Sequence, residues 1–149
     1  MLHLNAILHP TDFSGHSKYA FRLACSLARD HDARLIVLHV VTTLGAELVP
    51  VGEAATHLQP EGYRHILWDD LKRVQSADPT VSVDHRLVEG DPVAEILRVA
   101  KESACDMIVL GTHGRTGLER LLMGSVAEQV VRKAPCPVLT VKAPQSFSG

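Results

Sequence analysis

The stretch Met107-Ile108-Val109-Leu110-Gly111-Thr112-His113-Gly114, with Gly124-Ser125 following after nine further residues, decides how the rest of this chain is interpreted. Its first four residues form a short apolar run of β-formers, which predicts a strand that ends at Gly111. Glycine has no Cβ, so the backbone at Gly111 and Gly114 can approach a phosphate closely. The stretch therefore predicts a strand followed by a loop with the geometry of a phosphate site.

A helix is expected directly after this loop. Ser125-Val126-Ala127-Glu128 matches the capping box, with Ser125 as the N-cap and Glu128 at the third helical position. The unpaired N–H groups and the positive dipole end of such a helix attract an anion by roughly 0.3–1 kcal/mol. Arg115 adds a cation to the same loop. A turn and a helix cap without any ligand fit the same spacing, so spacing alone leaves both interpretations open.

Composition limits the class of protein. The chain has 149 residues, of which 46% are hydrophobic and 21% charged, so we expect one globular domain spanning residues 1–149. A net charge of -2 gives no broad basic face for nucleic acid. Without a membrane-length apolar run or signal-peptide features, the protein is expected to be soluble and cytoplasmic.

Cysteine and histidine residues do not point to a metal centre. Cys25, Cys105 and Cys136 form no Cys-x-x-Cys pair and are expected to be small buried groups. The nine histidines are scattered, without the spacing of metal ligands on a helix. We therefore expect no dedicated metal-ligating residues.

Apolar patterns along the chain alternate between the strand and helix periods. Strands are expected at residues 4–9, 34–41, 80–88, 107–110 and 137–142. Helices are expected at residues 14–30, after a loop over 42–62, from the Asp91-Pro92 cap, and after Ser125. This order predicts an α/β fold with a parallel sheet covered by helices.

Ligands in such sheets bind beyond the carboxyl ends of the strands, where the strand order reverses. Asp12 follows the first strand and Gly111 ends the fourth, so the two residues flank one crevice if these strands are neighbours. Turn statistics favour a different role for Asp12, as a turn residue ahead of a helix capped by Ser14.

Several motifs together resemble the universal stress protein family. They are Pro10-Thr11-Asp12-Phe13-Ser14, Leu38-His39-Val40, the Gly111-x-x-Gly114-x9-Gly124-Ser125 pattern and Cys136-Pro137-Val138. The resemblance spans nearly the whole chain, and the glycine pattern is that of the nucleotide-binding branch. It implies an open, Rossmann-like sheet of five parallel strands in the order 3-2-1-4-5, with helices on both faces.

The resemblance also implies a ligand and a partner. The ligand is ATP, or ADP or AMP, accompanied by Mg²⁺ or Mn²⁺ held through the phosphates. The residues it assigns to the nucleotide are Pro10, Thr11, Asp12, Val40, Gly111, Thr112, His113, Gly114, Arg115, Thr116, Gly117, Gly124, Ser125, Val126 and Ala127. The family commonly forms homodimers through its last strand, which here is Val138, Leu139, Thr140 and Val141.

Three functions fit these motifs. The first is an ATP-binding module in a stress response or signalling pathway, with no catalytic residue. The second is an enzyme that slowly hydrolyses ATP or transfers a nucleotidyl group, but His113 has no recognisable group to orient it as a base. The third is a dimeric adaptor that binds no nucleotide. The chain lacks a P-loop motif and a Gly-x-Gly-x-x-Gly motif, which excludes those two nucleotide-binding classes.

Overall fold

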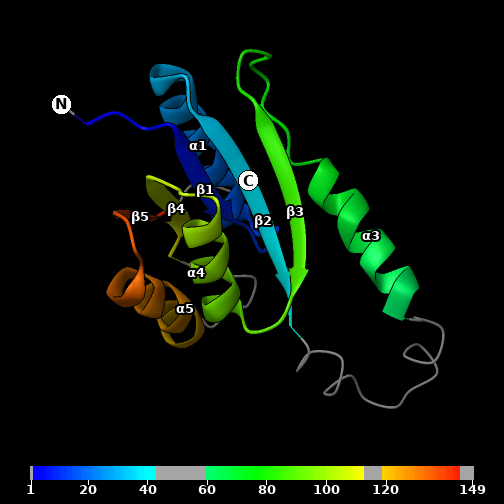
Figure 1. Cartoon of the computed structure of the whole chain (residues 1–149). Coiled ribbons are helices and arrows are strands. Elements are labelled where there is room, and N and C mark those ends of the chain that lie inside the picture. The colour runs from blue at the N-terminus through cyan, green and yellow to red at the C-terminus, as the bar shows by residue number, and fades with distance from the viewer. Residues whose placement is uncertain (1, 43–59, 113–118, 145–149) are drawn as a thin grey trace.

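The computed structural model of this protein describes residues 2–42, 60–112 and 119–144, and confirms the predicted alternation of strands and helices (Figure 1). The strands are β1 (Ala6–Pro10), β2 (Arg34–Val41), β3 (Val83–Glu89), β4 (Met107–Gly111) and β5 (Val138–Val141). The helices are α1 (Gly15–His31), α3 (Pro60–Lys72), α4 (Pro92–Glu102) and α5 (Glu119–Lys133). The predicted bounds of β2 agree with the structure at both ends, and most other ends shift by one to three residues.

The five strands form one parallel sheet in the order β3-β2-β1-β4-β5, as expected. β1 lies in the middle and pairs with β2 on one side and β4 on the other. Because all strands are parallel, their carboxyl ends lie along one edge of the sheet. β3 and β5 are the two outer strands of this sheet.

Each face of the sheet is covered by its own pair of helices. α1 and α3 contribute Ala20, Ala24 and Leu71 to one buried cluster. α4 and α5 contribute Ile96 and Val130 to the cluster on the other face. Strand side chains alternate between the two clusters, as the two-residue period of a strand requires. The sheet is therefore buried on both faces.

Some large apolar residues of the helices lie outside the core. Leu23, Ile66 and Val131 are 39%, 49% and 52% exposed. They lie at the margins of their helical stripes, and a helix packed on one sheet buries only the centre of such a stripe. The loop predicted over residues 42–62 falls mainly outside the described residues, although α3 already begins at Pro60. Proline is favoured at the first position of a helix.

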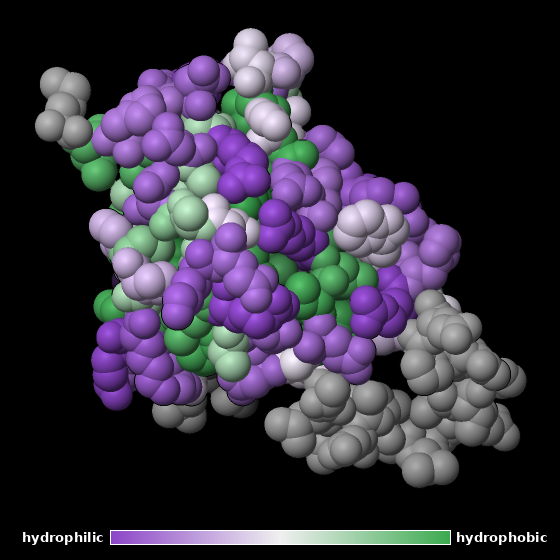
Figure 2. All heavy atoms as spheres, in the orientation of Figure 1, coloured by the Kyte–Doolittle hydropathy of each residue, from purple (hydrophilic) through white to green (hydrophobic). Residues whose placement is uncertain are grey.

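The surface is mainly formed by hydrophilic residues in the orientation of Figure 1, with hydrophobic residues showing in smaller areas between them (Figure 2). Cys105 is buried, Cys25 and Cys136 are half-buried, and all three are free thiols.

In the part of the chain that the structure describes, no helix has both the length and the apolar character needed to cross a membrane.

Candidate functional site

The strand order reverses between β1 and β4. From β1 the chain proceeds outward through β2 to β3, and then returns to place β4 against the other edge of β1. The carboxyl ends of β1 and β4 therefore adjoin at Pro10 and Gly111. This is the switch point at which open α/β sheets bind their ligands.

The turn after β1 is built by hydrogen bonds among its own residues. Asp12 Oδ1 accepts from Ser14 N at 3.0 Å and from Ser17 Oγ at 2.7 Å. Thr11 Oγ1 accepts from Phe13 N at 3.1 Å, and Phe13 takes a left-handed backbone with φ of 66°. The turn role expected as the alternative for Asp12 is thus confirmed, and it fixes the half-buried Asp12 beside the switch point.

The helix after this turn begins as predicted. Ser14 is the N-cap of α1, and its Oγ accepts from Ser17 N at 3.1 Å. The capping bond satisfies one of the unpaired N–H groups of the first turn. The start of α1 is therefore set by the turn after β1, which lies beside the switch point.

Val40 presents main-chain groups to this crevice. Along a strand of a parallel sheet, successive residues direct their N–H and C=O groups to alternate neighbours. Leu38 O accepts from Thr11 N on the β1 side at 2.8 Å, whereas Val41 O accepts from Gly90 N on the β3 side at 2.9 Å. The groups of Val40 therefore face the β1 side. Since β1 pairs with β2 only as far as Leu38, they face the space beyond the end of β1.

Gly111 is closely packed against the start of α1. A Cβ at this position would lie 3.2 Å from the carbonyl oxygen of His16, in the first turn of α1. A contact that short is tighter than most real Cβ contacts. Close approach of protein backbone gives this glycine a packing role, and its predicted contact with a phosphate stays a prediction.

Thr112 follows Gly111 at the carboxyl end of β4. Its N donates to Val141 O at 3.0 Å, which extends the pairing of β4 with β5 by one residue. Its Oγ1 is buried and has no hydrogen-bond partner in the part of the chain that the structure describes. An unpaired buried hydroxyl is costly, so such an atom needs either a ligand or another explanation.

The predicted start of the last helix is wrong. α5 begins at Glu119, so Gly124 and Ser125 lie inside the helix and Ser125 is not its N-cap. Five good or neutral helix formers, Glu119 to Met123, precede Gly124, and one glycine costs too little to stop a helix. The exposed Ser125 accepts from Gln129 Nε2 at 3.3 Å through Oγ.

Val126 and Ala127 are likewise not at a helix start. Both pack against the core cluster beneath α4 and α5, and Ala127 is buried. Only the first four N–H groups of a helix lack a partner within it, so those of residues 125–127 are used by α5 itself. The predicted loop residues His113, Gly114, Arg115, Thr116 and Gly117 lie outside the described residues.

Two histidines that the sequence analysis did not assign lie beside the site. His39 Nδ1 donates to Thr11 O at 2.8 Å, and its ring lies 4.4 Å from that of Phe13. His9, fully buried on β1, donates from Nδ1 to Val109 O at 2.9 Å. Burial lowers the pKa of His9 to about 4, so the ring is neutral at physiological pH. The signal for His9 was a histidine within an apolar strand run.

A hollow lies elsewhere on the surface. It measures about 350 Å³ and is lined by Arg64, His65, Trp68 and Leu87, from α3 and β3. Arg64 is paired with Glu89 at 3.0 Å. The hollow lies beside the outer strand β3, away from the switch point. None of the residues predicted to bind a nucleotide lines it. The switch point therefore remains the candidate site.

Comparison with known proteins agrees with this arrangement. The family model described as "Universal stress protein family" matches residues 3–142. Universal stress protein MJ0531 of Methanocaldococcus jannaschii is 38% identical over 141 residues, covering 93% of this chain and 82% of the relative. A putative universal stress protein of Staphylococcus epidermidis is 32% identical and covers 99% of this chain and 91% of its own.

Solved structures show the same fold. The structure of hypothetical protein MJ0577 is 29% identical, with a TM-score of 0.72, and the match covers 97% of this chain and 100% of that one. A universal stress protein solved in complex with cAMP is 29% identical with a TM-score of 0.67, covering 94% and 98% of the two chains. On the match to the family model and the identity to these relatives, this chain belongs to the universal stress protein family.

Proposed function

We propose that this protein binds an adenine nucleotide at the carboxyl ends of β1, β2 and β4, as a module of a stress response or signalling pathway. One observation carries the proposal: the buried Oγ1 of Thr112 has no protein partner among the described residues and lies at the switch point of the sheet. A phosphate oxygen at that point would accept its hydrogen bond.

The surrounding groups suit the other parts of a nucleotide. The main chain of Val40 offers a donor and an acceptor beyond the end of β1, which suits the edge of a base. Asp12 is anchored beside Thr11 and supplies carboxylate oxygen to the ribose hydroxyls. The phosphates extend over Thr112 toward the start of α5, with Mg²⁺ or Mn²⁺ bound through them.

A relative supports this choice of ligand. The universal stress protein that was solved with cAMP shares the fold over 94% of this chain and is 29% identical to it. The ligand of that protein contains adenine, ribose and phosphate. We propose the same ligand class here, with ATP as the first candidate and ADP and AMP as alternatives.

Binding without turnover is the activity we propose. Three titratable groups beside the switch point are engaged in building the protein. Asp12 Oδ1 holds the turn, His39 Nδ1 binds Thr11 O, and His9 is enclosed in the core. A general base has to reach the proton that it removes. Long incubation with ATP and product analysis tests this point, and release of phosphate or AMP well above the uncatalysed rate would support an enzyme.

Substitution of Thr112 by valine tests the proposal. Valine has nearly the same shape and removes a hydroxyl that has no described protein partner, so the free energy of unfolding should stay unchanged or rise slightly. If Oγ1 donates to a phosphate, affinity for ATP should fall by about tenfold to a hundredfold, the value of a hydrogen bond to a charged group. Calorimetric titration with ATP measures the change.

The matched control is Thr140→Val, at an exposed position of β5. It should leave ATP affinity unchanged. Equal affinity of Thr112→Val and the unmodified protein would remove Thr112 from the site. No binding of ATP, ADP or AMP by the unmodified protein would overturn the nucleotide proposal and favour the adaptor.

We also propose that the protein forms a homodimer through the free edge of β5, whose residues are Val138, Leu139, Thr140 and Val141. An outer strand has unpaired main-chain groups that favour pairing with another strand. A cytoplasmic location is part of the same proposal, and the three free thiols support it because reducing compartments keep cysteines unpaired.

A further inference from the structure

Cys105 and Cys136 lie at the amino ends of two neighbouring strands. Cys105 comes two residues before β4, and Cys136 two residues before β5. β4 and β5 are parallel with Ile108 opposite Val138, and Ile108 N donates to Pro137 O at 3.0 Å. Counting back along this register places Cys136 opposite Asp106, one residue from Cys105.

Both cysteines lie just before their strands, where the regular alternation of strand side chains ends. The amino ends of two neighbouring parallel strands lie about 4.8 Å apart. Disulfides usually join Cα atoms separated by about 4.4–6.8 Å. The neighbouring strand ends therefore bring the two cysteines into the range in which a disulfide can be tested.

The two side chains also share one face of the sheet. Cys105 belongs to the buried cluster beneath α4 and α5, and Cys136 packs against the same cluster. Burial raises the pKa of Cys105 to about 11, and the neighbouring Cys136 thiol contributes to the increase. Cys25 is on the other face, against the cluster of α1 and α3. The chain thus contains one close pair of thiols and one separate thiol.

We propose that Cys105 and Cys136 form a reversible intrachain disulfide when the protein is exposed to peroxide. Cys136 is the less buried of the pair, so its thiolate attacks the peroxide first. A sulfur–oxygen bond forms, the O–O bond breaks, and hydroxide leaves as water. The Cys105 thiolate then attacks the resulting sulfenic acid, an S–S bond forms, and a second water leaves. Two thiols are oxidised and one hydrogen peroxide is reduced to two waters.

The surroundings make this a slow reaction. Burial raises the pKa of both thiols, which reduces the fraction present as thiolate at neutral pH. Two guanidinium groups partly oppose the effect at Cys105. Arg86 Nη1 donates to Ser103 Oγ at 2.8 Å and Arg34 Nη2 to Ser103 O at 3.1 Å, and both charges favour the Cys105 thiolate. The bond is therefore expected to form under sustained peroxide exposure.

The bond would close the segment from residue 105 to residue 136. This segment contains β4 and α5. A cross-link between its ends restricts the unfolded chain and so raises stability. The two cysteines lie at the amino ends of the strands, opposite to the switch point. The proposal is therefore independent of nucleotide binding.

Treatment of the full-length protein with millimolar hydrogen peroxide tests the proposal. The titratable thiols of the denatured protein should fall from three to one, and the mass should fall by two hydrogen atoms. Tryptic digestion should then join peptide 102–115 to peptide 134–142, with Cys25 alone in peptide 23–29. Dithiothreitol should reverse the change, and the oxidised protein should melt at a higher temperature.

Cys25→Ser is the matched control, and it should lose both remaining thiols at the rate of the unmodified protein. Cys136→Ser and Cys105→Ala should each lose the joined peptides, and either variant suffices if the other does not fold. A bond to Cys25, a bond between two chains, or oxygen addition without the loss of two hydrogens would overturn the proposal.

Discussion

Asp106 shows how a single side chain can fix the middle of this sheet. Its Oδ2 accepts from Asn5 N at 2.7 Å and from Ala6 N at 3.0 Å, and its own N donates to Ala6 O at 2.8 Å. These partners are about one hundred residues away in sequence. In the sequence, Asp106 is simply a polar residue directly before the apolar run of residues 107–110. Its role could not be predicted, because local patterns carry no information about a distant partner.

The roles of the site residues were predictable only where their hydrogen-bond or packing partners are close in sequence. The turn roles of Asp12 and Ser14 were predictable, because their partners lie within five residues. The packing reason for Gly111 was not, since it depends on how closely α1 approaches β4. His9 was not assigned either, because its partner Val109 is brought to it by the pairing of β1 and β4.

The buried His9 should make stability depend on pH. Burial lowers the pKa of His9 from 6.5 to about 4, so the unfolded chain binds a proton more readily than the folded one between these values. The contribution of the neutral ring is therefore complete above pH 6.5 and lost as the pH falls toward 4. At 1.36 kcal/mol per pKa unit, the loss reaches about 3 kcal/mol.

The variant His9→Asn tests this prediction. Asparagine can still donate a hydrogen bond to Val109 O but does not titrate in this range. Urea unfolding at several pH values between 7 and 4 should show a shallower loss of stability for His9→Asn, whatever its stability at neutral pH. His3→Asn, at an exposed position, is the control. Parallel pH curves for His9→Asn and the unmodified protein would show that His9 does not cause the acid sensitivity.

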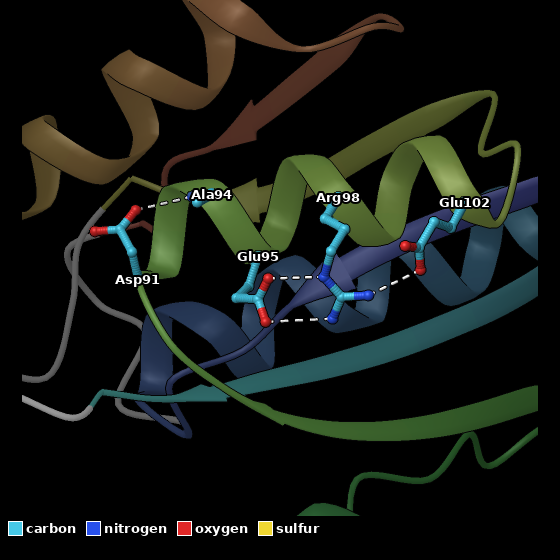
Figure 3. A network of polar contacts seen from close by, with 5 residues as sticks. All are labelled: Asp91, Ala94, Glu95, Arg98 and Glu102. Carbon is cyan, nitrogen blue, oxygen red and sulfur yellow. Dashed lines mark hydrogen bonds and ion pairs between the residues drawn. The ribbon is translucent and has the colours of Figure 1, made fainter.

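The start of a helix was predicted well where a capping residue is followed by a residue that favours the first helical turn. Asp91 caps α4 with its Oδ2 accepting from Ala94 N at 2.9 Å, and Pro92 occupies the first helical position (Figure 3). Ser125 resembles such a cap but is preceded by residues that continue the helix. The capping pattern shows where a helix can begin, and the upstream residues decide whether it has begun already.

Removal of the α4 cap should cost measurable stability. Asp91→Ala leaves Ala94 N without its capping bond and should lower the free energy of unfolding by about 1 kcal/mol. Asp91→Asn keeps an acceptor oxygen and should therefore retain most of the stability that the cap contributes. Chemical denaturation with urea measures both. Equal stability of Asp91→Ala and the unmodified protein would mean that water replaces the cap at no cost.

Arg98 provides a comparison on the same helix. It binds Glu95 at 2.7 Å and Glu102 at 2.8 Å along the outer face of α4 (Figure 3). These hydrogen bonds raise the pKa of Arg98. Because the side chains are solvated, the pairs contribute little, and Arg98→Ala should destabilise the protein less than Asp91→Ala does. High salt should weaken the Arg98 contribution further.

At the scale of the molecule, the strand order was predicted through the family resemblance, and alternation alone predicted only a parallel sheet. The order places β5 at one edge of the sheet. Its successive residues direct their main-chain groups alternately toward β4 and away from the sheet. Pro137 O accepts from Ile108 N of β4, and Val141 O accepts from Thr112 N just after β4, so the main-chain groups of Thr140 face outward. Any pairing with a second copy through β5 would therefore use Thr140.

Thr140→Pro should convert the proposed dimer to a monomer. Proline removes the outward N–H but none of the bonds to β4, and it is tolerated on an outer strand. Size-exclusion chromatography with light scattering measures the mass. Thr140→Val, which keeps the N–H, should remain dimeric. A monomeric unmodified protein, or a dimeric Thr140→Pro variant, would exclude pairing through this edge.

The central position of β1 has a consequence for synthesis on the ribosome. β1 emerges first, yet one of its two neighbours, β4, follows about one hundred residues later. Until then, the nascent chain exposes the edge of Ala6–Pro10 that later pairs with β4. An exposed edge of an apolar strand favours aggregation unless a chaperone covers it. Completion of the sheet, and with it any ligand pocket at the switch point, therefore has to wait until β4 and β5 have been synthesised.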